Sequence, residues 1–244
     1  MEYKINQDDQ GRPIVRAKEL SQKTIEFPFE FDYQLINYNQ KSKRLIIFLH
    51  GFSNDAIFMT RKFTSMISDP LFKDCAFFSL NGPFPVIEKG NNKDIQKKKW
   101  KIGFAWYLYD RGENFYYYTQ DTAASFIMAA LKSLHLNDIP STVIGYSQGG
   151  YLAPFLALRQ QNINHIIGIN SCFKHEYLPK DLSFQIDAIH GRDDNIVEYD
   201  RSKQAHEKII SMGNRGKFIS LENQHHRLTH EFVLQSMNLI NEKR

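Results

Sequence analysis

The pentapeptide Gly145-Tyr146-Ser147-Gln148-Gly149 restricts what this chain can fold into more than any other segment, because of what stands on either side of it. The residues before it, 141–144, are β-branched and mostly apolar, which is typical of a buried strand. The residues after it, 150–158, are mostly apolar and predict a buried helix. The glycines leave room for a sharp strand-to-helix turn, with Ser147 at its tip beside the free N–H groups of the helix N-terminus.

Strand and helix patterns alternate along most of the chain. Apolar runs predict strands at 44–49, 75–80, 165–169, 184–189 and 217–221, and helical patterns cover 55–68, 121–135, 200–212 and 229–239. Segment 27–35 alternates apolar and polar residues, and its Pro28 places it at a sheet edge. We therefore expect an α/β fold with a mostly parallel sheet, helices on both faces and an N-terminal edge strand.

The length of 244 residues suits a single α/β domain over residues 1–244. Segment 82–118 is too long for an ordinary connection, so it is interpreted as a loop-like or cap-like insertion with short elements of its own. It contains the basic run Lys97-Lys98-Lys99-Trp100-Lys101, preceded by Lys89 and Lys93. This run indicates either a solvated loop or a patch that attracts anionic substrates or lipid headgroups at a membrane surface.

Composition narrows the class of protein. A net charge of +4 over 244 residues does not favour nucleic-acid binding. The aromatic content of 14% indicates an aromatic-lined pocket or extra core phenylalanines. Cys75 and Cys172, both in apolar surroundings, suit a reducing compartment. With no apolar run of signal-peptide or transmembrane length, a cytoplasmic protein is expected.

Polar residues follow the strands whose carboxyl ends meet at one sheet edge, where such folds bind ligands. A serine nucleophile needs a histidine base, which in turn needs an acid that orients it. Both follow Ser147 along the chain. Asp193 and Asp194 come after the strand 184–189, and residue chemistry alone leaves open which of the two is the acid. The candidates for the base are His225 and His226 after the last strand, and His230 on the last helix.

Two backbone N–H groups must also stabilise the oxyanion that forms during acyl transfer. The residue after the nucleophile, Gln148, would supply one of them. The loop 50–54 after the first buried strand would supply the other from Phe52. His50 precedes Ser147 in the chain and is expected to shape this loop and not to act as the base.

Taken together, these residues resemble the phospholipase/carboxylesterase family of α/β-hydrolases, which includes acyl-protein thioesterases and small bacterial carboxylesterases. The resemblance rests on Leu49-His50-Gly51, on segments 145–150 and 190–197, and on His226, and it extends over about residues 44 to 242. It implies an α/β-hydrolase fold. It favours Asp194, which fits the family pattern H-G-x-x-D-x-x-V, and it favours His226 as the base. Segment 103–107 resembles the family's tryptophan segment, which implies that Trp106 and Tyr107 line the acyl pocket.

The chain departs from the family pattern at several positions. Ser53 replaces a glycine, Glu198 replaces a proline, and Gln224-His225 stands where a glycine precedes the histidine. Segment 86–118 is longer and more basic than the family pattern. These departures concern the substrate range more than the mechanism.

The sequence thus predicts a serine hydrolase that cleaves a carboxylic ester, thioester or lysophospholipid bond through an acyl-enzyme. Ser147 is the expected nucleophile, His226 the base and Asp194 the acid that orients it. The expected substrate is a small acyl ester with an apolar acyl part, and neither a metal ion nor an organic cofactor is expected. The alternatives are a peptidase or lactone hydrolase on the same fold, and a non-catalytic binding protein that retains the pocket.

Overall fold

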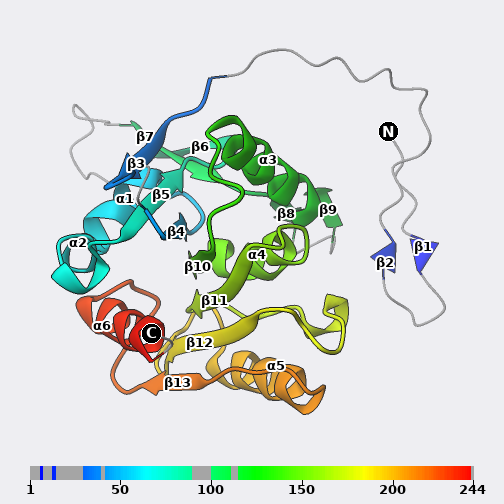
Figure 1. Cartoon of the computed structure of the whole chain (residues 1–244). Helices are drawn as coiled ribbons and strands as arrows, with labels where there is room; N and C mark the ends of the chain where they lie inside the picture. Colours follow the sequence, from blue (N-terminus) through cyan, green and yellow to red (C-terminus); the bar gives the residue numbers. More distant parts are fainter. Residues whose placement is uncertain are drawn as a thin grey trace.

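The computed structural model describes residues 6–7, 13–14, 30–39, 42–89, 100–110 and 115–242. Its centre is a seven-stranded sheet with the strand order β13-β12-β11-β10-β4-β5-β3 (Figure 1). All neighbouring strands run parallel except β3, which pairs antiparallel with β5 at one edge. The strands are β3 (Tyr33–Ile36), β4 (Arg44–Leu49), β5 (Cys75–Leu80), β10 (Ser141–Tyr146), β11 (Ile163–Ile169), β12 (Gln185–Gly191) and β13 (Phe218–Leu221).

The strands expected in the centre of the sheet are present, and the edge strand is β3. Pro28, the reason for expecting an edge strand at 27–35, lies outside the described residues. A separate two-stranded sheet is formed by β1 (Asn6–Gln7) and β2 (Pro13–Ile14).

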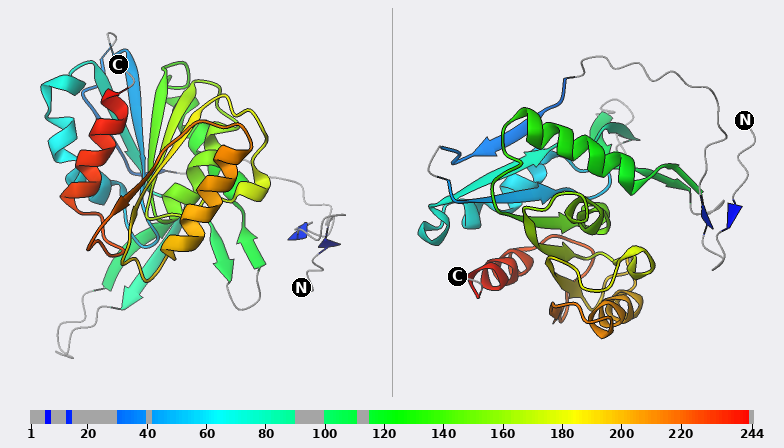
Figure 2. Two further views of the ribbon diagram at one scale, coloured as in Figure 1. Left: turned by 90° about the horizontal axis from the view of Figure 1, so that it is seen from below. Right: turned by 45° about the vertical axis from the view of Figure 1, so that its right-hand side comes forward.

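Helices cover both faces of the sheet. The helices are α1 (Ala56–Lys62), α2 (Thr64–Ile67), α3 (Gln120–Ser133), α4 (Gln148–Ala157), α5 (Tyr199–Ser211) and α6 (His230–Asn241), with short 3-10 turns η1 (Pro70–Phe72) and η2 (His175–Tyr177). Figure 2 shows α1, α2 and α6 on one side of the sheet and α3, α4 and α5 on the other. Within β4, Leu45, Ile47 and Leu49 pack on the α3–α4 side. Ile46 and Phe48 pack on the α1–α6 side, so that β4 is buried on both faces.

The helix predicted over 55–68 is interrupted in the structure. The Asp55 carboxylate accepts a hydrogen bond from the Phe58 N–H at 2.6 Å and caps α1. The regular helix stops at Phe63, whose backbone leaves the helical region and whose ring is fully buried and stacks on Phe48. Packing of this ring therefore coincides with the break between α1 and α2.

Residues 82–118, expected to form an insertion, contain two β-ribbons. The pairs are β6 (Phe84–Lys89) with β7 (Trp100–Ala105), and β8 (Leu108–Asp110) with β9 (Phe115–Tyr118). Strand β7 also reaches the loop after β4, because Ser53 N–H donates to Phe104 O at 2.9 Å and Phe104 N–H donates to Asn54 O at 2.8 Å. Of the basic run, Lys93 and residues 97–99 lie outside the described residues.

Both cysteines are free and buried, at Cys75 and Cys172. Among the described segments, no helix combines the length and the apolar character needed to cross a membrane.

The strand-to-helix turn joins β10 to α4 and brings α4 close to β4. A Cβ atom on Gly149 would lie 2.2 Å from the carbonyl oxygen of Leu49. A Cβ atom on Gly145 would lie 2.4 Å from the carbonyl oxygen of Gly149. Both obstacles are backbone atoms, which cannot move without displacing the strand or the helix. The two glycines are therefore required by close approach of the backbone.

We predict that Gly149→Ala lowers the free energy of unfolding by about 2 kcal/mol or more, because overpacking forces the backbone to shift. Urea denaturation monitored by circular dichroism would measure the change. Ala153→Gly, in the same buried helix, serves as the comparison, because it removes a methyl group and adds none. An unfolding free energy of Gly149→Ala equal to that of the wild type would contradict the close approach.

Candidate active site

Ser147 stands at the tip of the turn with a strained backbone. Its φ of 48° and ψ of −115° lie in a region that L-residues rarely adopt. The Ser147 N–H donates to the carbonyl of Ile169 at 2.8 Å, which ties the turn to the end of β11. The strained turn presents the Ser147 hydroxyl at the carboxyl edge of the sheet.

His226 and Asp194 continue from Ser147 in a line of hydrogen bonds. The Nε2 atom of His226 lies 3.0 Å from Ser147 Oγ, and its Nδ1 atom lies 2.7 Å from Asp194 Oδ2. A carboxylate only accepts hydrogen bonds, so Nδ1 carries the proton and Nε2 is left with a lone pair facing the serine hydroxyl. The arrangement can therefore take a proton from Ser147.

The environment of Asp194 keeps its carboxyl group ionised. Its side chain is fully buried, and Oδ1 accepts hydrogen bonds from Ile196 N–H and Val197 N–H, each at 2.9 Å. Burial by itself raises the pKa of Asp194, but the hydrogen bonds from His226 and from the two backbone N–H groups outweigh it. The pKa of Asp194 therefore lies below its usual range, as a residue that must stabilise a protonated histidine requires.

The other candidates for acid and base lie outside this line. Asp193 is exposed and its carbonyl lies 2.9 Å from His225 Nδ1, while its N–H donates to Gln224 O at 3.0 Å. His225 is also exposed, and the exposed His230 begins α6. Asp193 and His225 thus shape the two loops, and the structure brings Asp194 and His226 to Ser147.

Two residues that the sequence analysis did not single out hold these loops together. Asn170, fully buried after β11, accepts a hydrogen bond from Gly191 N–H at 2.9 Å and donates one to His225 O at 3.1 Å. The hydroxyl of Tyr146 donates to His226 O at 3.2 Å. Burial, followed by the nearby Asp194 charge, raises the pKa of Tyr146 to about 12, so this hydroxyl remains a donor at neutral pH. Asn170 and Tyr146 thus hold the loop that carries His226 through its backbone carbonyls.

The expected oxyanion donors lie on two neighbouring segments. Phe52 belongs to the loop that β7 holds in place, and Gln148 is the first residue of α4. Neither backbone N–H has an acceptor within the described part of the chain, as is usual for the first residues of a helix. These donors are therefore available to a ligand beside Ser147.

The side chain of Gln148 has a second function. Its Oε1 accepts a hydrogen bond from Trp106 N–H at 2.9 Å, and its Nε2 donates to Tyr107 O at 2.8 Å. Gln148, the residue after Ser147, thus fixes the backbone between β7 and β8. A long polar side chain at the start of an otherwise apolar helix is the signal in the sequence that could have indicated this contact.

His50 shapes the loop after β4, as expected from its place in the chain. Its Nδ1 lies 2.8 Å from Gly51 O, and its Nε2 lies 2.9 Å from Gly82 N. The Gly82 N–H can only donate, so His50 Nε2 must accept and the ring must be neutral, with its proton on Nδ1. Burial lowers the pKa of His50 to about 4, which keeps the ring neutral at ordinary pH.

Trp106 lies behind the cleft and does not line it, in contrast to the role that the resemblance implied. Its ring is fully buried and stacks on His50, and its indole N–H donates to His50 O at 2.8 Å. The backbone hydrogen bonds of Trp106 and Tyr107 to Gln148 turn this segment so that Tyr107 faces the cleft. Of this pair, only Tyr107 is a lining residue.

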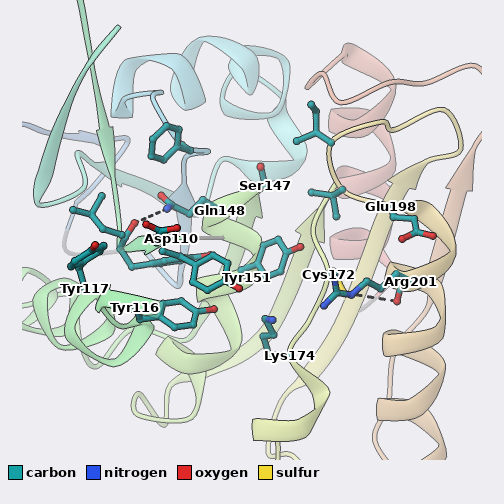
Figure 3. Close-up of a pocket in the computed structure, with 16 residues that line it drawn as sticks. Asp110, Tyr116, Tyr117, Ser147, Gln148, Tyr151, Cys172, Lys174, Glu198 and Arg201 are labelled. Atoms are coloured by element: carbon teal, nitrogen blue, oxygen red, sulfur yellow. Dashed lines mark hydrogen bonds between the residues drawn. The ribbon is translucent and has the colours of Figure 1, made fainter. Parts of the chain in front are cut away.

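A cleft of about 1060 Å³ opens beside Ser147 (Figure 3). Tyrosines and charged residues outnumber the aliphatic residues in its lining. The lining residues other than Ser147 and Gln148 are Phe52, Tyr107, Leu108, Tyr109, Asp110, Tyr116, Tyr117, Tyr151, Cys172, Lys174, Ile196, Val197, Glu198 and Arg201. Within the described residues, no three His, Cys, Asp or Glu side chains are grouped as a metal site would require.

Comparisons with known proteins agree with this architecture. A family model described as Phospholipase/Carboxylesterase matches residues 32–242. No curated protein matches the chain. The crystal structure of esterase PE8 is 20% identical and aligns with a TM-score of 0.68 over 88% of this chain and 99% of its own.

Other solved structures are similar to a comparable degree. Acyl-protein thioesterase 2 from Zea mays is 16% identical, with a TM-score of 0.59 over 86% of this chain and 98% of its own. A carboxylesterase from Mesorhizobium loti is 18% identical, with a TM-score of 0.61 over 86% of this chain and 94% of its own. These matches confirm the predicted α/β-hydrolase fold.

The neutral state of His50 predicts a specific pH dependence of stability. Between the unfolded pKa of about 6.5 and the folded pKa of about 4, only the unfolded chain binds a proton at this position. The contribution of His50 is complete above about pH 6.5 and falls by about 2 kcal/mol between pH 7 and pH 5. Urea denaturation of the wild type and of His50→Asn at both pH values isolates this contribution, because the other histidines are common to both proteins. An equal loss of stability in the two proteins would show that His50 is protonated in the folded state.

Proposed function

The chain belongs to the phospholipase/carboxylesterase family, and from this premise we propose that it hydrolyses carboxylic ester bonds, thioesters included, through an acyl-enzyme on Ser147. The observation that carries the proposal is the continuous line of hydrogen bonds from Asp194 through His226 to Ser147, beside an open cleft. A buried carboxylate, a histidine with one free lone pair and a serine on a strained turn are the groups that activate a serine hydroxyl.

In the first half of the proposed reaction, Ser147 Oγ attacks the carbonyl carbon of the ester while His226 Nε2 takes the hydroxyl proton. The ionised Asp194 stabilises the imidazolium that results. The carbonyl oxygen, now negatively charged, accepts hydrogen bonds from the N–H groups of Phe52 and Gln148. When the tetrahedral intermediate collapses, the bond to the leaving oxygen or sulfur breaks, and His226 donates its proton to that atom.

In the second half, a water molecule attacks the acyl-enzyme, with His226 as its base. The same two N–H groups bind the second oxyanion. Collapse returns the proton to Ser147 Oγ and releases the carboxylic acid. Every proton that moves is carried by His226, and the proposed steps require neither a metal ion nor an organic cofactor.

We predict that Ser147→Ala lowers kcat/KM for p-nitrophenyl butyrate at least about 10⁴-fold, because the acyl-enzyme cannot form. Release of p-nitrophenol measures the rate, and circular dichroism checks that the variant folds. Turnover at the wild-type level in a folded Ser147→Ala protein would eliminate this serine as the nucleophile.

The neighbouring aspartates offer a matched pair of variants. Asp194→Asn is expected to lower kcat about 10³-fold to 10⁴-fold, because an amide favours the wrong tautomer of His226 and does not stabilise its cation. Asp193→Asn removes the same charge one residue away and is expected to leave kcat within about twofold, since that side chain is exposed. The assignment of Asp194 fails if the two variants lose activity equally or if Asp193→Asn loses more.

A further inference from the structure

Two cationic side chains line the cleft although its chemistry, as proposed, uses neither of them. Lys174 precedes η2 in the segment after β11, and Arg201 lies on the first turn of α5. Within the described part of the chain, neither the Lys174 ammonium nor the Arg201 guanidinium forms an ion pair or a hydrogen bond. Lys174 is partly buried, whereas Arg201 is exposed, so only the Lys174 charge is partly shielded from solvent.

The two cations lie on the same side of the cleft. Figure 3 shows Lys174 and Arg201 approaching each other from different elements, with Tyr151 between Lys174 and Ser147 in that view. A second cavity of about 410 Å³ is lined by both residues and by Cys172, and also by Lys208 from α5. Positive charge therefore collects where the two cavities share residues, away from Ser147.

Tyrosine hydroxyls accompany these cations. Burial raises the pKa of Tyr107 well above its usual value, and the nearby hydroxyls of Tyr116 and Tyr151 raise it further. The ring centroids of Tyr107 and Tyr116 lie 6.0 Å apart, and both residues line the cleft together with Tyr151. Burial also raises the pKa of Tyr116, so the Tyr107 and Tyr116 hydroxyls stay protonated at neutral pH and can donate hydrogen bonds. Donors of this kind suit an acceptor-rich group.

Carboxylates are present as well: Asp110 and Glu198 line the cleft, and Glu176 lines the second cavity. Glu198, at the start of α5, lines the cleft without an ion-pair contact to Arg201. Burial raises the pKa of the Cys172 thiol, which lies beside both cavities. The positive charges of Arg201 and Lys174 have the opposite effect and lower the pKa of Cys172. Each of these two effects is larger than the increase caused by Glu176 or by Glu198. Burial thus outweighs the two cations at Cys172, but the charges of Arg201 and Lys174 reach the space that both cavities share.

We propose that Lys174 and Arg201 form a subsite for an anionic group, a carboxylate or a phosphate, carried by the substrate at a distance from the ester carbonyl. This rests on the proposed function and specifies its substrate class. A guanidinium and an ammonium together match the planar or tetrahedral oxygens of such a group through charge-assisted hydrogen bonds. The apolar side chains of Phe52, Leu108 and Ile196 line the same cleft and contact the apolar part of the ester.

Matched esters test the subsite. On the acyl side, p-nitrophenyl hexanoate is compared with two anionic esters. One is mono-p-nitrophenyl adipate, and the other carries a terminal phosphate in place of the free carboxylate of the adipate. On the alcohol side, butyl hexanoate is compared with the hexanoate ester of γ-hydroxybutyrate in a pH-stat. Each pair differs only by the remote anion, and the carboxylate and phosphate arms identify which anion is preferred.

In at least one pair, the wild type is expected to favour the anionic ester in kcat/KM by about tenfold, the size of one charge-assisted contact in a cleft open to water. Lys174→Met and Arg201→Met should each remove most of this preference while leaving kcat/KM for the neutral ester within about twofold. Lys203→Met serves as the control, because this exposed residue lies on α5 and lines neither cavity. Lys203→Met should change neither the preference for the anionic ester nor kcat/KM for the neutral ester.

The outcomes separate the two proposals. Hydrolysis of the neutral esters with no preference for any anionic partner overturns the subsite and leaves the esterase proposal standing. The subsite is also overturned by a preference that survives in both the Lys174→Met and Arg201→Met proteins. If the wild type hydrolyses none of the esters, the proposed function fails, and the subsite fails with it.

Discussion

The close approach of the strand-to-helix turn to β4 is the constraint on which the rest of the site depends. Gly149 lies against the Leu49 carbonyl, and Ser147, two residues earlier in the same turn, has a backbone conformation with positive φ. That conformation aims the Ser147 hydroxyl at His226 and places the Gln148 N–H at the first turn of α4. The proposed nucleophile and one proposed oxyanion donor are thus placed by one backbone feature.

Neutral polar groups, buried or partly buried, then connect this turn to the rest of the carboxyl edge. The Gln148 side chain binds the backbone of Trp106 and Tyr107, and the Trp106 indole binds the His50 carbonyl. His50 in turn accepts a hydrogen bond from Gly82. The start and the middle of segment 82–118 are therefore fixed to the loop that carries Phe52, and the same segment supplies the tyrosines of the cleft. The segment between β5 and α3 shapes the cleft because of these few hydrogen bonds.

Much of the architecture could be predicted from the sequence, because buried parallel strands leave continuous apolar runs such as 44–49 and 75–80. Other features depend on tertiary contacts that no local pattern carries. Burial and loop hydrogen bonds distinguish Asp194 from Asp193, two residues of identical chemistry. Trp106 lies behind the cleft because its indole binds His50, a residue 56 positions away. Lys174 and Arg201 share a cleft only because η2, which Lys174 directly precedes, contacts α5, and neither residue stands in a motif.

The central claim is that the hydrogen-bonded line of Asp194, His226 and Ser147 makes this serine nucleophilic. Reaction with a fluorophosphonate, followed by peptide mapping in a mass spectrometer, tests it most directly, because the reagent modifies activated serines without requiring a particular acyl substrate. The account predicts one adduct, on Ser147, that forms rapidly in the wild type and in His225→Gln and at least about a hundredfold more slowly in His226→Gln. An unmodified Ser147, or labelling of equal rate in both histidine variants, would contradict it.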